Sequence, residues 1–220
     1  MFTPFEDATA APIIRGFLHQ PTQPNHSALA LTHGAGGNCK SKLLVAVAEA
    51  LAATGFTVLR FDLPFRQARP FGPPRPGAAD QDRAAILRAV TLLKSRAPEK
   101  IFLAGHSYGG RQSSILLADH PDAADGLLLL SYPLHPPNKP DQLRTQHFPQ
   151  LRKPAFFVHG TRDPFATTAE LKSALTLIPA PHTLLEVENA AHDLARKKSS
   201  RDDLATRIAQ QFQSFAAATN

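Results

Sequence analysis

The sequence predicts a single α/β domain over residues 1–220, with a mostly parallel central sheet and helices on both of its faces. Short apolar runs of strand length alternate with amphipathic stretches of helix length along most of the chain. A glycine-rich turn at 105–109 joins one such strand directly to one such helix. The hydrophobic content of 43% and the charged content of 19% are typical of a globular chain that buries a sizeable core.

In the first half of the chain, apolar runs and helical spacing predict three strands and two helices. We expect an edge strand at 13–18, further strands at 28–32 and 56–61, and helices at 41–54 and 80–96. Gly55 is expected to end the first of these helices. Five prolines and three arginines between 62 and 80 predict an irregular loop.

The second half of the chain continues the same alternation. We expect strands at 101–104, 126–131, 155–159 and 183–187, and helices at 110–118, 168–177 and 201–215. A second proline-rich loop occupies 132–154. Both proline-rich loops leave the carboxyl end of a strand, which is where open α/β sheets bind ligands. Each therefore either walls a pocket or forms a surface loop stiffened by proline.

The turn at 105–109 reads Gly-His-Ser-Tyr-Gly, which is the pattern G-x-S-x-G between a strand and a helix. In this context the turn holds the serine in strained backbone angles and points its hydroxyl out at the carboxyl end of the sheet. A side chain at Gly105 or Gly109 would collide with the neighbouring strand or helix. The pattern therefore predicts Ser107 as a nucleophile.

A serine nucleophile needs a base that takes its proton and a carboxylate that orients the base. Asp163 follows the strand predicted at 155–159, and His192 follows the strand predicted at 183–187. Both lie downstream of Ser107, in the order acid and then histidine, at the same edge of the sheet. We therefore expect Asp163 as the acid and His192 as the base.

Other acids fit less well. Asp141 lies in a loop whose path the sequence does not define, and Asp193 is adjacent to His192, so its side chain is expected to point elsewhere. Asp193 is kept as a second acid behind the base.

Two backbone N–H groups are expected to bind the oxyanion that forms when the serine attacks a carbonyl. One belongs to Tyr108, directly after the nucleophile, and the other to Ala35 in the glycine-rich turn at 33–37. Glycines in that turn let the backbone approach a substrate closely. His33 and Gly34 are weaker candidates for substrate contact.

Arg111 lies in the first turn of the helix that follows Ser107. A cation there opposes the helix dipole unless it has a partner. We therefore expect an ion pair with a carboxylate of the protein, and the alternative is a carboxylate of the substrate.

Composition limits the other classes of function. The net charge of +6 is spread along the chain, and its densest basic cluster, at 196–201, is followed by two aspartates. The absence of Trp leaves few aromatic residues on which bases could stack. We therefore expect no nucleic-acid partner. No H-E-x-x-H, C-x-x-C or G-x-G-x-x-G pattern predicts a metal or dinucleotide site, so no cofactor is expected.

The expected location is the cytoplasm. No apolar run is long enough to span a membrane, and the N-terminus lacks the basic segment of a secretion signal. The single cysteine, Cys39, excludes an internal disulfide and fits a reducing compartment. A packing role is expected for it.

These motifs resemble the α/β-hydrolase superfamily over about residues 13–215. HGAGG at 33–37, GHSYGGR at 105–111, HGTRD at 159–163 and His192 are similar to the small capless branch related to dienelactone hydrolases. Within it, the chain most resembles the group of bacterial hydrolase-like proteins, testis-expressed relatives and a subunit of the nonspecific-lethal histone acetyltransferase complex. The resemblance implies Ser107 as nucleophile, Asp163 as acid and His192 as base, with serine where dienelactone hydrolases have cysteine.

The expected function is hydrolysis of a small ester, thioester or related acyl substrate through an acyl-enzyme. The alternative is a catalytically idle scaffold of the same fold that binds a protein partner, because some relatives act in that way. The intact serine, histidine and aspartate argue against the scaffold, since binding needs none of them.

Overall fold

The structure is a computed structural model that describes residues 2–96, 99–195 and 201–219. An eight-stranded sheet runs through it in the order β1-β2-β4-β3-β5-β6-β7-β8. Its strands are β1 (Phe2–Asp7), β2 (Ile14–His19), β3 (Ser27–Thr32), β4 (Thr57–Phe61), β5 (Lys100–His106), β6 (Gly126–Leu130), β7 (Ala155–Gly160) and β8 (His182–Val187). Strands β3 to β8 form a parallel sheet, onto which β2 and then β1 pair antiparallel.

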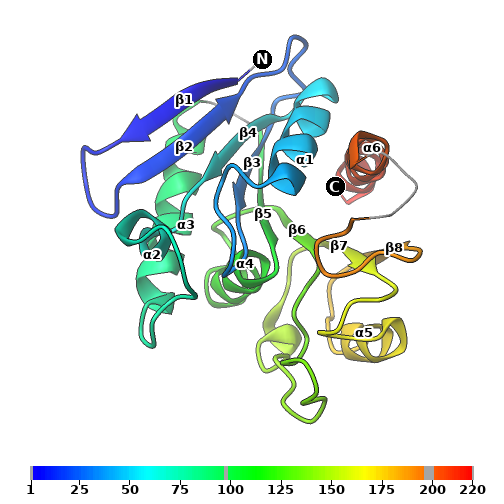
Figure 1. Cartoon of the computed structure of the whole chain (residues 1–220). Coiled ribbons are helices and arrows are strands. Elements are labelled where there is room, and N and C mark those ends of the chain that lie inside the picture. Colours follow the sequence, from blue (N-terminus) through cyan, green and yellow to red (C-terminus); the bar gives the residue numbers. More distant parts are fainter. Residues whose placement is uncertain (1, 97–98, 196–200, 220) are drawn as a thin grey trace.

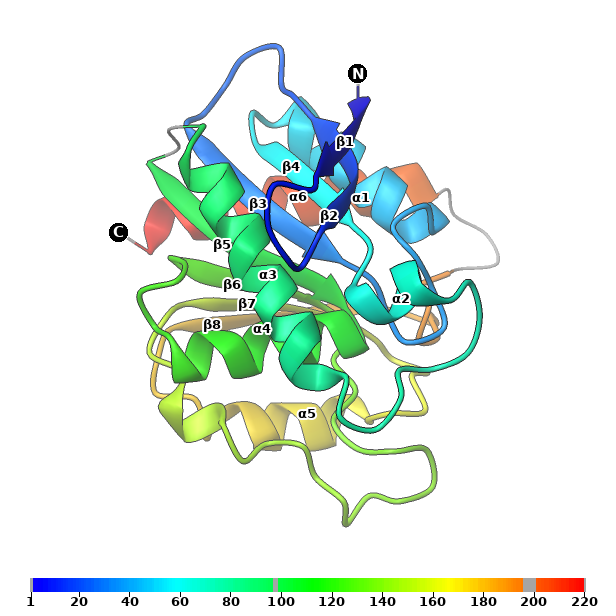
Figure 2. The ribbon, with the colours of Figure 1, turned by 90° about the vertical axis from the view of Figure 1, so that its left-hand side faces the viewer.

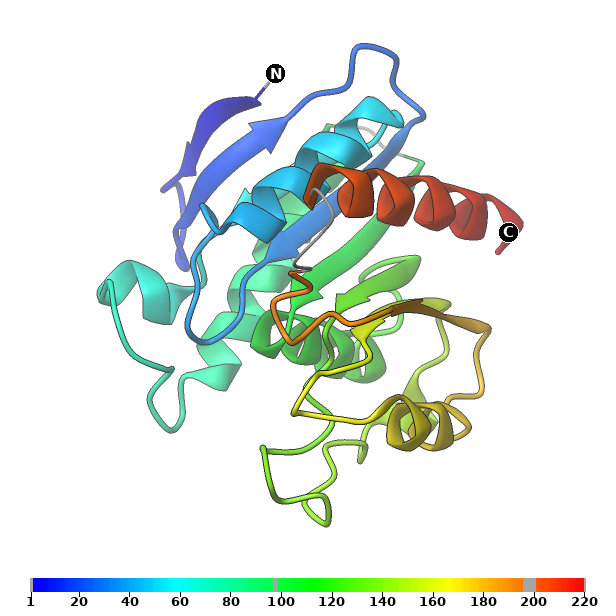
Figure 3. The same cartoon turned by 45° about the vertical axis from the view of Figure 1, so that its right-hand side comes forward.

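Helices cover both faces of the sheet, as the alternating pattern predicts. On one face, α1 (Lys42–Ala53) and α6 (Arg201–Ala218) lie side by side (Figure 3). On the other face lie α3 (Ala79–Lys94), α4 (Tyr108–Asp119) and α5 (Thr168–Leu175) (Figure 2). Because the parallel strands are buried on both faces, they read as continuous apolar runs rather than alternating ones.

The core consists of two apolar layers, one on each side of the sheet. Ile86, Val90 and Leu93 of α3 pack into one layer, whereas Leu87 of the same helix is 38% exposed. Phe212 of α6 packs against Phe56 and Phe102 in the other layer.

The N-terminal segment corrects the prediction that 13–18 is an edge strand. Phe2–Asp7 forms β1, which pairs with β2 and takes the edge position. An edge strand tolerates Pro4 because one side of it needs no hydrogen-bond partner.

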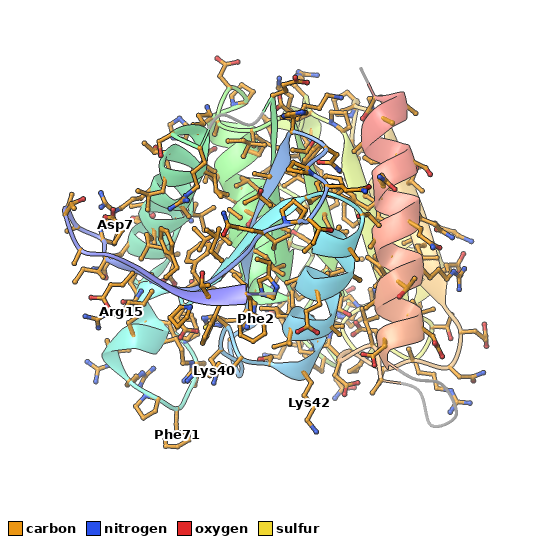
Figure 4. All side chains as sticks on the ribbon, turned by 90° about the horizontal axis from the view of Figure 1, so that it is seen from above. Phe2, Asp7, Arg15, Lys40, Lys42 and Phe71 are labelled. Carbon is orange, nitrogen blue, oxygen red and sulfur yellow. The ribbon has the colours of Figure 1, made fainter. Side chains whose placement is uncertain are left out.

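The proline-rich stretch after β4 corrects a second prediction, because a short helix, α2 (Pro64–Ala68), begins within it. Pro64 is its first residue, a position where the missing N–H costs nothing. Beyond α2 the chain is irregular, and Phe71 there is 82% exposed and points outward (Figure 4).

The loops after the parallel strands gather at one end of the sheet, the lower end in Figure 1. Both proline-rich loops hang from this end, and the second contains only a short 3-10 helix at Phe148–Gln150. Among the described residues, no helix is long and apolar enough to cross a bilayer. Most of the basic cluster predicted at 196–201 lies outside the described residues.

Candidate active site

Ser107 occupies the sharp turn between β5 and α4. Its backbone angles are φ 50° and ψ −115°, outside the regions that residues with a side chain normally adopt. Strain of this kind persists only where the surrounding structure enforces it, and it marks functional positions. The strand, turn and helix on either side of Ser107 are those that the G-x-S-x-G pattern predicts.

Glycines on either side of the turn allow β3, β5 and α4 to approach closely. A Cβ at Gly105 would lie 2.4 Å from the backbone nitrogen of Gly110 in α4. A Cβ at Gly109 would lie 2.6 Å from the carbonyl oxygen of His33, just after β3. Both positions therefore exclude a side chain, as the pattern predicts.

The side chains of Ser107, His192 and Asp163 lie in hydrogen-bonding series. His192 Nε2 is 2.8 Å from Ser107 Oγ, and His192 Nδ1 is 2.8 Å from Asp163 Oδ2. An ionised carboxylate only accepts, so Nδ1 carries the proton and Nε2 is left to accept from the serine hydroxyl. The structure thus brings together three residues separated by 56 and 29 positions in the sequence.

The loop after β7 fixes the carboxylate. The Asp163 side chain is fully buried, and its Oδ1 accepts a hydrogen bond of 2.9 Å from the backbone N–H of Phe165. The Phe165 ring stacks on the imidazole of His192, with ring centroids 4.1 Å apart and an interplanar angle of 29°. Phe165 therefore covers one face of the histidine, a contact that the sequence analysis missed.

His106 holds the loop that carries His192. Its Nε2 lies 2.9 Å from the backbone carbonyl oxygen of His192. Burial lowers the pKa of His106 to about 4, so the ring is neutral near pH 7 and its Nε2–H donates to that carbonyl. His106, at the end of β5 and next to Ser107, thereby helps to fix the position of His192.

The glycine-rich turn presents Ala35 to the site. The carbonyl of Gly34 accepts from Gly37 N–H at 3.0 Å and lies 2.9 Å from His33 Nδ1, so the Ala35 N–H of the same trans peptide points the opposite way. Within the described part of the chain, neither this N–H nor that of Tyr108 has a hydrogen-bond acceptor. Both are therefore available to a ligand.

The side chains of Tyr108 and His33 point away from Ser107. The Tyr108 hydroxyl donates to Asp82 Oδ2 of α3 at 2.7 Å, and burial raises the pKa of Asp82 above its usual range. His33 is fully buried and its Nε2 accepts from Leu63 N–H at 3.1 Å. The sequence left His33 as a weak candidate for substrate contact, but it does not line the cavity at the site.

A cavity of about 480 Å³ opens beside the serine, towards α1. Its lining includes Ser107, His192 and the turn Gly34–Gly37, and Leu43, Leu44 and Phe165 give it apolar walls. Lys42 also contributes and extends outward from the start of α1 (Figure 4). Neither proline-rich loop contributes to this lining. The first loop instead lines a separate cavity of about 280 Å³, with Pro64, Phe65 and Arg75 among its walls, so for this loop the pocket-wall alternative is confirmed, but away from Ser107.

Arg111 lacks the carboxylate partner that its position predicts. Among the described residues it forms no ion pair, and its Nε is buried without a hydrogen-bond partner. The groups around it are cationic or neutral: burial and the nearby Arg111 charge lower the pKa of His147 to about 4 and also lower the pKa of Arg144. The predicted ion pair is therefore wrong.

Two further observations concern metal ligands and the single cysteine. Within the described ranges, no group of three His, Cys, Asp or Glu side chains is placed to hold a metal ion. Cys39 is buried, and burial raises the pKa of its thiol to about 12, in keeping with a packing role.

A mostly parallel sheet with a nucleophile turn after its central strand, and a histidine and an aspartate at the same edge, defines the class of α/β hydrolases. The chain belongs to the family described as alpha/beta hydrolase domain, whose model matches residues 25–220. The narrower resemblance to the testis-expressed group stays a prediction.

Solved structures of similar fold cover nearly the whole chain. A dienelactone hydrolase from Anabaena variabilis matches with a TM-score of 0.75 at 18% identity, covering 97% of each chain. Est1E from Butyrivibrio proteoclasticus matches with a TM-score of 0.76 at 18% identity, covering 98% of this chain and 99% of its own. A serine hydrolase without a lid from Xanthomonas campestris matches with a TM-score of 0.73 at 18% identity, covering 97% and 94%. At these identities the likeness establishes the fold alone.

Proposed function

We propose that the protein is a serine hydrolase that cleaves a small carboxylic ester, thioester or related acyl substrate through an acyl-enzyme. The observation that carries this proposal is the series of two 2.8 Å hydrogen bonds from Ser107 through His192 to Asp163. A scaffold would have no need of a strained serine, an oriented imidazole and a buried carboxylate in contact.

The proposed reaction has two halves. Ser107 Oγ attacks the carbonyl carbon of the substrate while its proton passes to His192 Nε2, and Asp163 stabilises the resulting imidazolium. The tetrahedral oxyanion is held by the N–H groups of Ala35 and Tyr108, and the amino end of α4 adds a favourable dipole. His192 then protonates the leaving alcohol or thiol.

In the second half, water replaces the leaving group. His192 takes a proton from the water, which attacks the acyl carbon, and the collapse of the second tetrahedral intermediate returns the proton to Ser107 and releases the acid. Every proton transfer uses groups that the chain supplies, so the proposed reaction requires no cofactor.

The cavity supports an apolar substrate group. Leu43, Leu44 and Phe165 offer hydrocarbon surface, and a cavity of about 480 Å³ accommodates a short chain or a single aromatic ring. One structural neighbour, Est1E, has been solved with ferulic acid bound, an aromatic acid of this size. We therefore propose short aliphatic or aryl esters as the first substrates to test.

Arg111 is a secondary candidate for substrate contact. It lies one helical turn beyond Ser107, because its backbone N–H donates to the Ser107 carbonyl at 2.9 Å, and it has no carboxylate partner among the described residues. A carboxylate of the substrate is the chemistry that would suit it, and such a group would have to extend beyond the cavity beside Ser107, which Arg111 does not line.

A fluorophosphonate probe tests the proposed function. Such a probe phosphonylates a serine only when a base activates it, so the wild type should be labelled stoichiometrically and Ser107→Ala not at all. Ser113→Ala, in the same helix, is the matched control and should label like the wild type. A folded wild type that takes up no probe would exclude the hydrolase and favour the scaffold.

A further inference from the structure

Arg66 is a buried cation whose hydrogen-bond partners are all backbone carbonyls. It belongs to α2, the short helix after β4, and only 6% of its surface is exposed. Among the described residues it forms no ion pair with a carboxylate. Burying a guanidinium without a carboxylate is costly, and such a residue is retained where its hydrogen bonds serve another purpose.

Two of these hydrogen bonds reach the glycine-rich turn that faces Ser107. Arg66 Nη2 donates to the carbonyl oxygen of Ala35, and Arg66 Nε donates to that of Gly37, both at 2.7 Å. These distances are at the short end of those for charge-assisted hydrogen bonds. The guanidinium therefore spans the turn and fixes two of its peptide groups at once.

The other two hydrogen bonds connect Arg66 to the loop that follows α2. Arg66 Nη2 donates to the carbonyl of Gly72 at 3.0 Å, and Nη1 donates to that of Arg69 at 3.3 Å. Four of the five N–H groups of the guanidinium are thereby used. Through these two hydrogen bonds the proline-rich loop, which does not line the cavity, fixes the position of the guanidinium.

This arrangement bears on the N–H group that we assign to the oxyanion. Ala35 is held from both sides, because Gly37 and His33 hold the carbonyl that precedes its N–H and Arg66 holds its own carbonyl. With both flanking peptide planes fixed, the Ala35 N–H cannot rotate away from the cavity. A donor fixed in advance costs no reorganisation when the oxyanion forms.

We propose that Arg66 is a positioning residue for the oxyanion site: through its hydrogen bonds to the carbonyls of Ala35 and Gly37 it locks the turn at 35–37 so that the Ala35 N–H faces the reacting carbonyl. The inference rests on the proposed hydrolase function. It assigns no contact between Arg66 and the substrate, because four of the five N–H groups of the guanidinium donate to carbonyls of the protein and the residue does not line the cavity.

The test compares Arg66→Met and Arg66→Lys with Arg69→Met. Arg69 is the matched control, an arginine of the same loop that donates to the carbonyl of Pro73 and not to the turn at 33–37. Each variant is assayed with p-nitrophenyl acetate, and kcat is expressed per active site, counted by titration with fluorophosphonate to completion. Misfolded protein therefore does not enter kcat.

We expect Arg66→Met to lower kcat per site roughly 10–100-fold with KM changed less than about threefold, because an oxyanion donor acts in the transition state. Inhibition by trifluoroacetophenone provides the second readout. Its carbonyl carbon takes up the Ser107 oxygen and its own oxygen becomes an oxyanion, so its inhibition constant should rise in parallel with the fall in kcat/KM. Arg69→Met should match the wild type in both readouts.

Arg66→Lys retains the charge but not the fork of donors, so an intermediate fall in kcat is expected. If Arg66→Met does not fold, Arg66→Lys carries the test with the same readouts. The inference about Arg66 would be overturned, with the proposed function left standing, by either of two results. One is folded Arg66 variants with wild-type kcat per site and wild-type inhibition. The other is an equal loss in Arg69→Met. A wild type that neither labels nor turns over would overturn the proposed function and this inference together.

Discussion

At the scale of single residues, some side chains at the site could be predicted from sequence motifs and others could not. Ser107, Asp163 and His192 follow a motif and a chain order, so their approach could be predicted from strand ends alone. Phe165 reaches the site through an irregular loop, and Arg66 through the short helix α2 that the sequence did not indicate; the paths of both segments depend on non-local packing. Arg111 was misjudged because the dipole argument considers its helix alone and not the neighbouring Arg144.

Asp163→Asn tests the orienting carboxylate. An amide in place of the carboxylate stabilises the wrong tautomer of His192 and removes the charge opposite the imidazolium, so kcat should fall roughly 10³–10⁴-fold. Asp141→Asn, at an exposed position of the loop 132–154, is the control and should retain wild-type kcat. Esterase assays of both purified variants provide the measurement, and equal activity of the two would contradict the assignment of Asp163.

At the scale of elements, the turn between β5 and α4 is the best-specified part of the chain. Its two glycines could be explained before the structure because a strand, a turn and a helix leave no room for side chains. Two other elements, α2 and β1, were not predicted because both contain proline. Proline is compatible with the start of a helix and with an edge strand as well as with a loop, so it did not distinguish these structures.

Gly105→Ala tests this close approach of α4 to β5. The new methyl group would lie 2.4 Å from backbone nitrogen and 2.5 Å from backbone carbon of the helix, so the free energy of unfolding should fall by at least about 2 kcal/mol. Gly36→Ala, whose Cβ would meet nothing within 4 Å, is the matched control. Its stability should change by less than about 1 kcal/mol. Urea unfolding of both variants measures the difference, and similar losses would contradict the packing described.

At the scale of the whole molecule, the parallel direction of β3 to β8 follows from the alternation of strands and helices in the sequence, whereas the order of the strands was not predicted. That alternation places the ends of β3, β5, β7 and β8 at one edge, which is what makes a site from distant segments predictable. The shape of the cavity was not predictable, because Leu43 and Leu44 enter it from a helix that the sequence indicates only as a core element.

Buried histidines predict that the protein loses stability in weak acid. Burial lowers the pKa of His19, His106 and His147 to about 4, well below the value of about 6.5 expected in the unfolded chain. The unfolded state therefore binds more protons between these limits, and stability falls as the pH decreases from about 6.5 towards 4. Burial also lowers the pKa of His33, which adds to this effect, whereas the raised pKa of Asp82 is a single group acting in the opposite direction.

Urea unfolding at pH 7, 6 and 5 should show this loss, with at most about 1.4 kcal/mol per pH unit from each histidine. His147→Gln should reduce the slope, since it removes one of these groups. A free energy of unfolding that stays constant from pH 7 to pH 5 would contradict the burial of these rings in the neutral form.

The most direct measurement is the mass of the protein during turnover. The wild type is mixed with p-nitrophenyl acetate, quenched in acid within the first turnovers, and digested. We expect one added acetyl group per molecule on the peptide that contains Ser107, and none in Ser107→Ala. Rapid hydrolysis with the acetyl group on another residue, or equal turnover by Ser107→Ala, would contradict this expectation.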